Sequence, residues 1–245
     1  MKRRRVALSL AVIASAALTS AVASAQPQPR GVIELFTSQG CSSCPPADKL
    51  AGELARDPSL VVLTLPVDYW DYLGWKDTLA MPGHTKRQRA YSKTRSDREV
   101  YTPQVVVNGA KHVLGSDRQA IDSAIAYTRK QAGMLSLPVS VSVTAEQISI
   151  SVPAAKQTSN GEIWLCPITK AAEVAIGRGE NSGQTVTYHN VVRSWVKLGE
   201  WTGVARTFKL PRQDVGSADA VAVLVQSGSK EAPGSMLGAT IASLR

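Results

Sequence analysis

The chain has 245 residues, a formal net charge of +9 and three cysteines. Its length allows two domains, and a charge of this size gives no reason to expect nucleic acid as a partner, because part of it lies near the N-terminus. The odd number of cysteines excludes a complete set of structural disulfides unless the protein dimerises.

Residues 1–25 have the pattern of a secretory signal peptide. Residues 2–5 are all basic, residues 6–23 are small or apolar without charge, and Ala23-Ser24-Ala25 is an A-x-A cleavage site before Gln26. We therefore expect a periplasmic or secreted protein with no stable membrane anchor. A retained anchor and twin-arginine export are the alternatives.

Two cysteines lie where a strand is followed by a helix. Residues 32–36 read as an apolar strand, a polar turn leads to Cys41-Ser42-Ser43-Cys44, and residues 47–54 have the apolar spacing of a helix. Pro45 and Pro46 are tolerated in a helix's first turn, where a missing N–H loses no partner. The free N–H groups of that turn stabilise a thiolate, so the pattern indicates a redox centre.

An unusual segment follows the next strand. Residues 60–65 read as a buried strand, which completes a β-α-β unit. Residues 67–77 then contain four aromatic residues and three aspartates. Two interpretations stay open: a loop that packs its rings on the domain, or a rim around the thiols that helps to select the substrate.

Residues 84–98 read as a basic helix, and residues 101–128 as a hairpin followed by a helix. We interpret the basic helix as a solvated face without a ligand, and His84 alone is weak support for catalysis or metal binding. Asn108-Gly109 predicts a two-residue turn, and Asp117 can cap the last helix. Pro103 precedes a predicted core strand, which suggests a cis bond or a functional constraint.

The order of these elements resembles thioredoxin. The resemblance implies that Cys41 is the attacking thiol, that Cys44 is the resolving thiol, and that Thr102-Pro103 is a cis-proline corner facing the disulfide. Departures from ordinary thioredoxins are Ser42-Ser43 in place of Gly-Pro, the lack of a tryptophan before Cys41, and the insertion at 68–77. They leave the partner and the redox potential open.

The chain more closely resembles DUF1223, a family of secreted proteins of unknown function. Five stretches that together span most of the chain carry this resemblance: ELFTSQGCSSCPPAD at 34–48, VDYWDYLGW at 67–75, RQRAY at 87–91, YTPQVVVNG at 101–109 and RGENSGQTVTYHNVVR at 178–193.

From about residue 134 the pattern changes to short alternating runs. Strands are predicted at 139–143, 148–152, 163–166, 174–176, 191–198 and 221–225. We therefore predict an α/β thioredoxin-like domain at 30–130, followed by an antiparallel β-sandwich-like domain at 135–245.

The Gly-rich segment 178–183 lacks the lysine and the spacing of a phosphate-binding P-loop, so we expect a hairpin connection and no cofactor. His189 is expected to hydrogen-bond within or between strands. Arg193 and Trp195 are candidates for contact with the first domain.

Three functions are compatible with the cysteine pair. We favour thiol–disulfide exchange with an envelope protein as substrate or redox partner, which would make the protein a thiol–disulfide oxidoreductase. A Cu(I) site needs only Cys41 and Cys44 as ligands, whereas structural zinc needs four ligands that this chain does not offer at close spacing. The third possibility is a binding or scaffold protein in which the disulfide is structural.

Two further residues have alternative roles. Glu34 lies seven residues before Cys41 in an apolar strand, so it is either a proton carrier for Cys44 or a salt-bridged glutamate. Cys166 is expected to be a small buried residue. A relay thiol or an intermolecular bridge is the alternative for Cys166.

Overall fold

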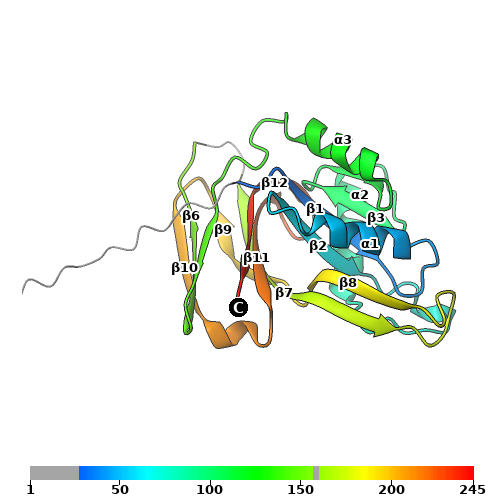
Figure 1. Ribbon diagram of the computed structural model, residues 1–245. Helices are drawn as coiled ribbons and strands as arrows, with labels where there is room; N and C mark the ends of the chain where they lie inside the picture. The colour runs from blue at the N-terminus through cyan, green and yellow to red at the C-terminus, as the bar shows by residue number, and fades with distance from the viewer. Residues whose placement is uncertain (1–27, 157–159) are drawn as a thin grey trace, which may run out of the picture.

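The computed structural model describes residues 28–156 and 160–245 (Figure 1). The predicted signal peptide at 1–25 lies outside these residues. None of the helices in the described ranges is long and apolar enough to cross a membrane.

Residues 31–128 alternate strands and helices. The elements are β1 (Gly31–Thr37), α1 (Pro45–Leu54), β2 (Leu60–Pro66), the short 3-10 helix η1 (Asp71–Leu73), α2 (Pro82–Thr94), β3 (Gln104–Val107), β4 (Lys111–Leu114) and α3 (Arg118–Thr128). Asp117 caps α3, because its side chain accepts a hydrogen bond from the Ala120 N–H. Asn108 and Gly109 both have positive φ angles, as the predicted tight turn between β3 and β4 requires.

The rest of the chain consists almost entirely of strands. They are β5 (Ser140–Val143), β6 (Gln147–Val152), β7 (Gly161–Ala175), β8 (Thr185–Val192), β9 (Val196–Trp201), β10 (Arg206–Pro211), β11 (Ala220–Gly228) and β12 (Pro233–Ser243), with the 3-10 helix η2 (Arg212–Val215) after β10.

The twelve strands β1 to β12 form a mixed nine-stranded sheet and a small three-stranded sheet. The large sheet has the order β12-β11-β7-β8-β2-β1-β3-β4, with β9 on β7, and the small sheet has the order β10-β6-β5. The large sheet crosses the predicted domain boundary, because β8 pairs in parallel with β2 at Thr64 and Val191. The two predicted domains therefore share one sheet, and the division itself stays a prediction.

The two faces of β1 bury different layers. Ile33 and Leu35 pack with residues of α1 and α3, whereas Val32 and Phe36 pack with Tyr91 of α2 and with residues of β7, β11 and β12. This alternation follows from the two-residue repeat of a strand. The opposite face of β7 and β11 packs on the small sheet, mainly through Val, Ile and Leu side chains, as expected for two stacked sheets.

Three strand predictions were wrong in their limits. The run at 163–166 and the first two residues of the run at 174–176 belong to one 15-residue strand, β7, whose second half forms a hairpin with β8. The run at 191–198 is split between β8 and β9, with Arg193 to Trp195 as the connection. An alternating pattern shows where strands lie but not which neighbour each one pairs with.

Candidate functional site

Cys41 and Cys44 form a disulfide at the start of α1. Cys44 is the residue before the first helical position, and Pro45 and Pro46 occupy the first turn, as the sequence predicted. The Cys44 N–H donates to the Cys41 carbonyl oxygen at 3.1 Å, which closes the turn between the two cysteines. The pair therefore lies at the positive end of the α1 dipole, which favours negative charge.

Pro103 lies on the same side of the molecule as this turn. The Thr102–Pro103 bond is cis, as expected. β3 pairs with β1 so that Gln104 is opposite Phe36, which places Pro103 next to the end of β1. A Cβ atom added to Gly115 would lie 3.1 Å from Pro103 Cβ and 3.2 Å from Ala47 Cβ, so the proline and the first turns of α1 pack around one glycine.

The segment 67–77 forms a wall beside the disulfide turn. Trp75 Nε1 donates to Gln39 Oε1 at 2.8 Å, and Asp77 Oδ2 accepts the Gln39 N–H at 2.8 Å. Trp70 Nε1 donates to Thr102 Oγ1 at 2.8 Å and so connects the wall to the proline corner. Tyr69, Trp70 and Trp75 pack on buried clusters of the molecule, as the first interpretation expected. The segment also borders the disulfide turn, while substrate selection stays a prediction.

The hairpin tip between β7 and β8, residues 176–184, covers the disulfide turn from the other side. Asn181 Nδ2 donates to the carbonyl oxygens of Gln39 and Cys41, both at 2.9 Å. Glu180 Oε2 accepts the Ser42 N–H at 3.2 Å. In Figure 1 this hairpin runs beneath α1. The sequence predicted the hairpin connection but not these contacts.

The hairpin tip and the wall also touch one another. A Cβ atom on Gly177 would lie 3.3 Å from Trp75 Cζ3, and Gly179, at a φ of 78°, is equally close to Trp75 Cβ. Glycine at 179 suits the positive φ there, and glycine at 177 lets the Trp75 ring approach the backbone without being displaced. The enclosure leaves Cys41 only 1% exposed and Cys44 0% exposed.

Asp48 is a buried carboxyl on the same helix as the disulfide. Its N–H donates to the Cys44 carbonyl oxygen at 3.1 Å, so Asp48 lies one helical turn after Cys44. Neither of its carboxyl oxygens makes a well-formed hydrogen bond with the described residues. Burial raises the pKa of Asp48 to about 8, with the Thr37 hydroxyl acting in the opposite direction and Asp77 in the same direction.

Glu34 lies on the opposite face of the sheet from α1. It forms an ion pair with Arg87, whose Nε is 2.6 Å from Glu34 Oε1, and it accepts a hydrogen bond from the Tyr91 hydroxyl. Arg87 also donates to Gln226 Oε1 at 2.8 Å. Glu34 is therefore the salt-bridged glutamate of the two alternatives. The buried carboxyl on the side of the sheet that carries the cysteines is Asp48.

This ion pair also corrects the interpretation of the basic helix. Arg87 is 8% exposed and Tyr91 is fully buried, so one face of α2 packs into the core and only the remaining positions are solvated. Burial of Arg87 requires a partner from β1, and the sequence of the helix does not reveal that partner.

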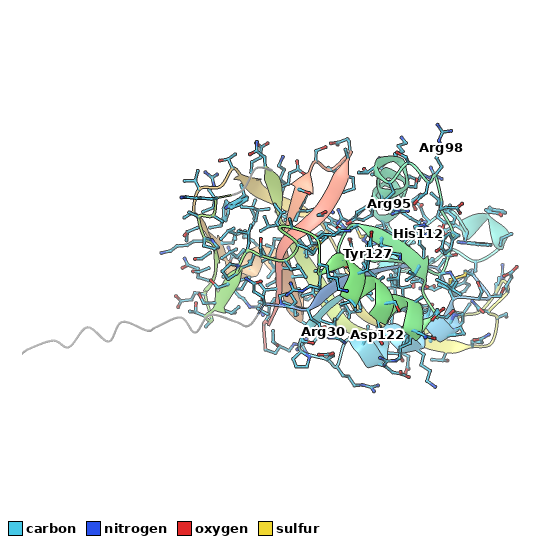
Figure 2. All side chains as sticks on the ribbon, turned by 90° about the horizontal axis from the view of Figure 1, so that it is seen from above. Arg30, Arg95, Arg98, His112, Asp122 and Tyr127 are labelled. Atoms are coloured by element: carbon cyan, nitrogen blue, oxygen red, sulfur yellow. A yellow bond between two sulfur atoms is a disulfide. The ribbon has the colours of Figure 1, made fainter. Side chains whose placement is uncertain are left out.

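The three histidines lie in different parts of the molecule and do not form a common site. His84 is buried, its Nδ1 is 2.9 Å from the Pro66 carbonyl oxygen, and burial lowers its pKa to about 4. His112 and Arg95, both labelled in Figure 2, each pair with Asp97. The His189 ring packs closely on Gly52 of α1. Across the described ranges, no group of three or more His, Cys, Asp or Glu residues could hold a metal ion.

Cys166 is a free, fully buried cysteine in β7, as expected. Burial raises the pKa of its thiol, which keeps it protonated and unreactive. Trp195 also fulfils the expectation of a contact with the first half of the chain, because the Arg87 guanidinium lies 4.3 Å from its ring centre.

A family model described as a protein of unknown function, DUF1223, matches residues 32–226. The chain belongs to this family. A protein from Agrobacterium tumefaciens with a crystal structure has 32% sequence identity to this chain. The match covers 90% of this chain and 97% of the Agrobacterium chain, and the two structures superpose with a TM-score of 0.81.

A second structure, HBP35 of Porphyromonas gingivalis, shares the fold with a TM-score of 0.60 at 14% identity, over 89% of this DUF1223 chain and 76% of its own. No protein with a curated description matches the chain.

Proposed function

We propose that this DUF1223 protein exchanges disulfides with protein substrates through Cys41 and Cys44, and that residues 31–128 act as a thioredoxin-like unit. The observation that supports this most strongly is the Cys41–Cys44 disulfide at the first turn of α1, beside Pro103. A Cys41 thiolate formed there lies near the positive end of the α1 dipole, which lowers the cost of its negative charge and favours exchange.

The exchange has two balanced steps. A substrate thiolate attacks Cys41 Sγ, a substrate–Cys41 disulfide forms, and the Cys41–Cys44 bond breaks with Cys44 leaving as a thiolate. A second substrate thiolate then attacks the substrate sulfur, so that the substrate keeps a disulfide and Cys41 leaves as a thiolate. An envelope redox partner reoxidises the pair. The same steps in reverse reduce a substrate disulfide.

Asp48 is suited to handle the proton of Cys44. The Cys44 sulfur is released into a buried site, where a bare thiolate is costly. A carboxyl with a pKa of about 8, one helical turn away, is largely protonated at neutral pH and can give its proton to that sulfur. In the reverse direction the carboxylate takes the proton back. We therefore assign Asp48, rather than Glu34, the role of proton carrier.

Exchange also requires the hairpin tip at 176–184 to move. Cys41 is 1% exposed, so no substrate thiolate reaches its sulfur in the closed arrangement. The contacts that hold the tip include the two hydrogen bonds of Asn181, the one of Glu180 and the packing of the tip on Trp75. Each hydrogen bond contributes ~0.5–1.5 kcal/mol, and the apolar packing adds to the free energy that this local opening costs.

The test is to express Cys44→Ser with its own N-terminal segment and to search the periplasm and the medium for proteins disulfide-linked to Cys41. The Cys41→Ser/Cys44→Ser variant is the control, and Cys166→Ser checks that the third cysteine is not the attachment point. Adducts that need Cys41 support the proposal. Binding of one Cu(I) per reduced wild-type chain, without adducts, supports the copper site. The absence of both adducts and bound copper supports a structural disulfide.

A further inference from the structure

A cavity of about 680 Å³ lies on the other side of the sheet from α1 and is distinct from the disulfide site. It opens between α2, the connection from β8 to β9, and the turn from β11 to β12. The lining residues that matter are Lys86, Arg89, Lys93, Trp164, Trp195 and Lys230. Its volume is within the range of about 300–1,000 Å³ that is typical of sites for small molecules.

The rim of this cavity carries an uncompensated positive charge. Lys86, Arg89 and Lys93 are spaced to project from one side of α2, and Lys230 adds a fourth exposed cation. None of these four forms a salt bridge with a carboxylate in the described parts of the chain. Glu231 is the single acidic residue of the lining. Several cations around one concave surface attract an anion.

The inner wall of the cavity is aromatic and held in place. Trp164 and Trp195 meet edge to face with ring centres 6.2 Å apart. Arg87 lies 4.3 Å from the Trp195 ring centre, and Arg87 is itself fixed by its ion pair with Glu34. An aromatic wall that is already ordered costs little entropy when it receives a flat or acyl group.

We propose that this cavity binds a small organic anion that has an apolar body and a carboxylate or phosphate head group. The body lies against Trp195, and the head group lies among Lys86, Lys93 and Lys230 at the rim. Neither half of the site is sufficient alone: exposed cations bind inorganic anions only weakly in water, and an uncharged apolar ligand gains nothing from the rim. The combination selects amphipathic anions.

The test uses anilinonaphthalenesulfonate, an aromatic anion, and its uncharged analogue N-phenylnaphthylamine, titrated by fluorescence into the folded full chain. We expect one dye molecule per chain. Lys86→Gln/Lys93→Gln should weaken binding of the anion about tenfold and leave the neutral probe unchanged. Lys49→Gln/Lys130→Gln, which removes the same charge from exposed positions outside the lining, should change neither.

Two further measurements define the ligand. Naphthoate and naphthyl phosphate, which share the ring and differ in the head group, are added as competitors, and the one that displaces the dye more strongly identifies the preferred head group. The Cys41→Ser/Cys44→Ser variant should bind the dye like the wild type, so the result does not depend on disulfide exchange. Dye binding that is insensitive to Lys86→Gln/Lys93→Gln, or that neither competitor reverses, would overturn the proposal.

Discussion

The side-chain amide of Asn181 donates a hydrogen bond of 2.9 Å to the carbonyl oxygen of Cys41, across 140 residues of sequence. Through this bond the β-rich half of the chain reaches the disulfide turn in the first half. The hairpin that carries Asn181 therefore contacts the backbone of the turn that holds Cys41, and the proposed exchange predicts that this contact limits access to the Cys41 sulfur.

Asn181→Ala should make the disulfide easier to reduce. Losing the two amide hydrogen bonds lowers the cost of opening by about 1–3 kcal/mol, which corresponds to a factor of about 5–150 in the rate of reduction by dithiothreitol. The measurement is alkylation of the released thiols, followed by mass spectrometry. Arg178→Ala, an exposed change in the same hairpin, should reduce at the wild-type rate. Equal rates for all three proteins would show that the hairpin does not limit access.

Asp48→Asn should stabilise the fold, and more so at high pH. The pKa of Asp48 rises from 3.8 to about 8 on folding, so between these values the folded state holds a proton that the unfolded state has lost. Stability therefore falls as pH rises from about 4 to 8, and the asparagine variant escapes that loss. Urea unfolding at pH 5, 7 and 9 should give a stability difference that grows with pH and levels off above the pKa.

Asp57→Asn is the matched control for this measurement. Hydrogen bonds from Ser59 lower the pKa of Asp57, so its contribution to stability is lost only as pH falls below 3.8. The stability of Asp57→Asn should therefore depend on pH between 5 and 9 in the same way as the stability of the wild type. If Asp48→Asn behaved like Asp57→Asn, Asp48 would not be the buried acid that the proton transfer needs.

Glu34→Gln should lower the free energy of unfolding by about 3–5 kcal/mol, because it leaves the Arg87 guanidinium buried without its carboxylate. The pH dependence of disulfide exchange should stay that of the wild type, whereas Asp48→Asn should remove its inflection near pH 8. Glu34→Gln/Arg87→Met should recover part of the lost stability. A change in the pH profile with Glu34→Gln would return the proton-carrier role to Glu34.

Trp70→Phe should loosen the wall at the proline corner without exposing the core. The change removes the 2.8 Å hydrogen bond to Thr102 Oγ1 and keeps most of the ring, so the expected loss of stability is about 0.5–1.5 kcal/mol. Reduction of Cys41–Cys44 should then accelerate less than with Asn181→Ala. Acceleration that exceeds that of Asn181→Ala would make the wall, and not the hairpin, the main barrier to access.

Local patterns were sufficient for the parts of the site that are close in sequence. Cys41 and Cys44 before a double proline predicted a strand–helix junction, and Asp117 predicted a helix start, because each effect acts within one helical turn. Pro103 alone suggested a cis bond or a functional constraint, and the resemblance to thioredoxin implied the cis bond. The structure confirmed these features.

The remaining parts of the site depend on contacts between distant segments. Asn181 looked like a hairpin residue, since nothing near it in sequence indicates that its amide meets the carbonyl oxygen of Cys41. Nothing near Asp48 in the sequence indicates that its carboxyl is buried, and it is the burial that raises its pKa. The basic helix that contains Arg87 was interpreted as solvated, because its sequence does not show that β1 places Glu34 beside Arg87.

The most direct test of the central claim is an equilibrium titration of the Cys41–Cys44 disulfide in glutathione buffers, read by alkylation and mass spectrometry. An exchangeable pair should be reduced at a midpoint between about −270 and −120 mV, with a glutathione adduct on Cys41 accumulating in Cys44→Ser. A disulfide that stays closed in every buffer above about −300 mV, with no adduct on Cys41, would be structural and would contradict the proposed exchange.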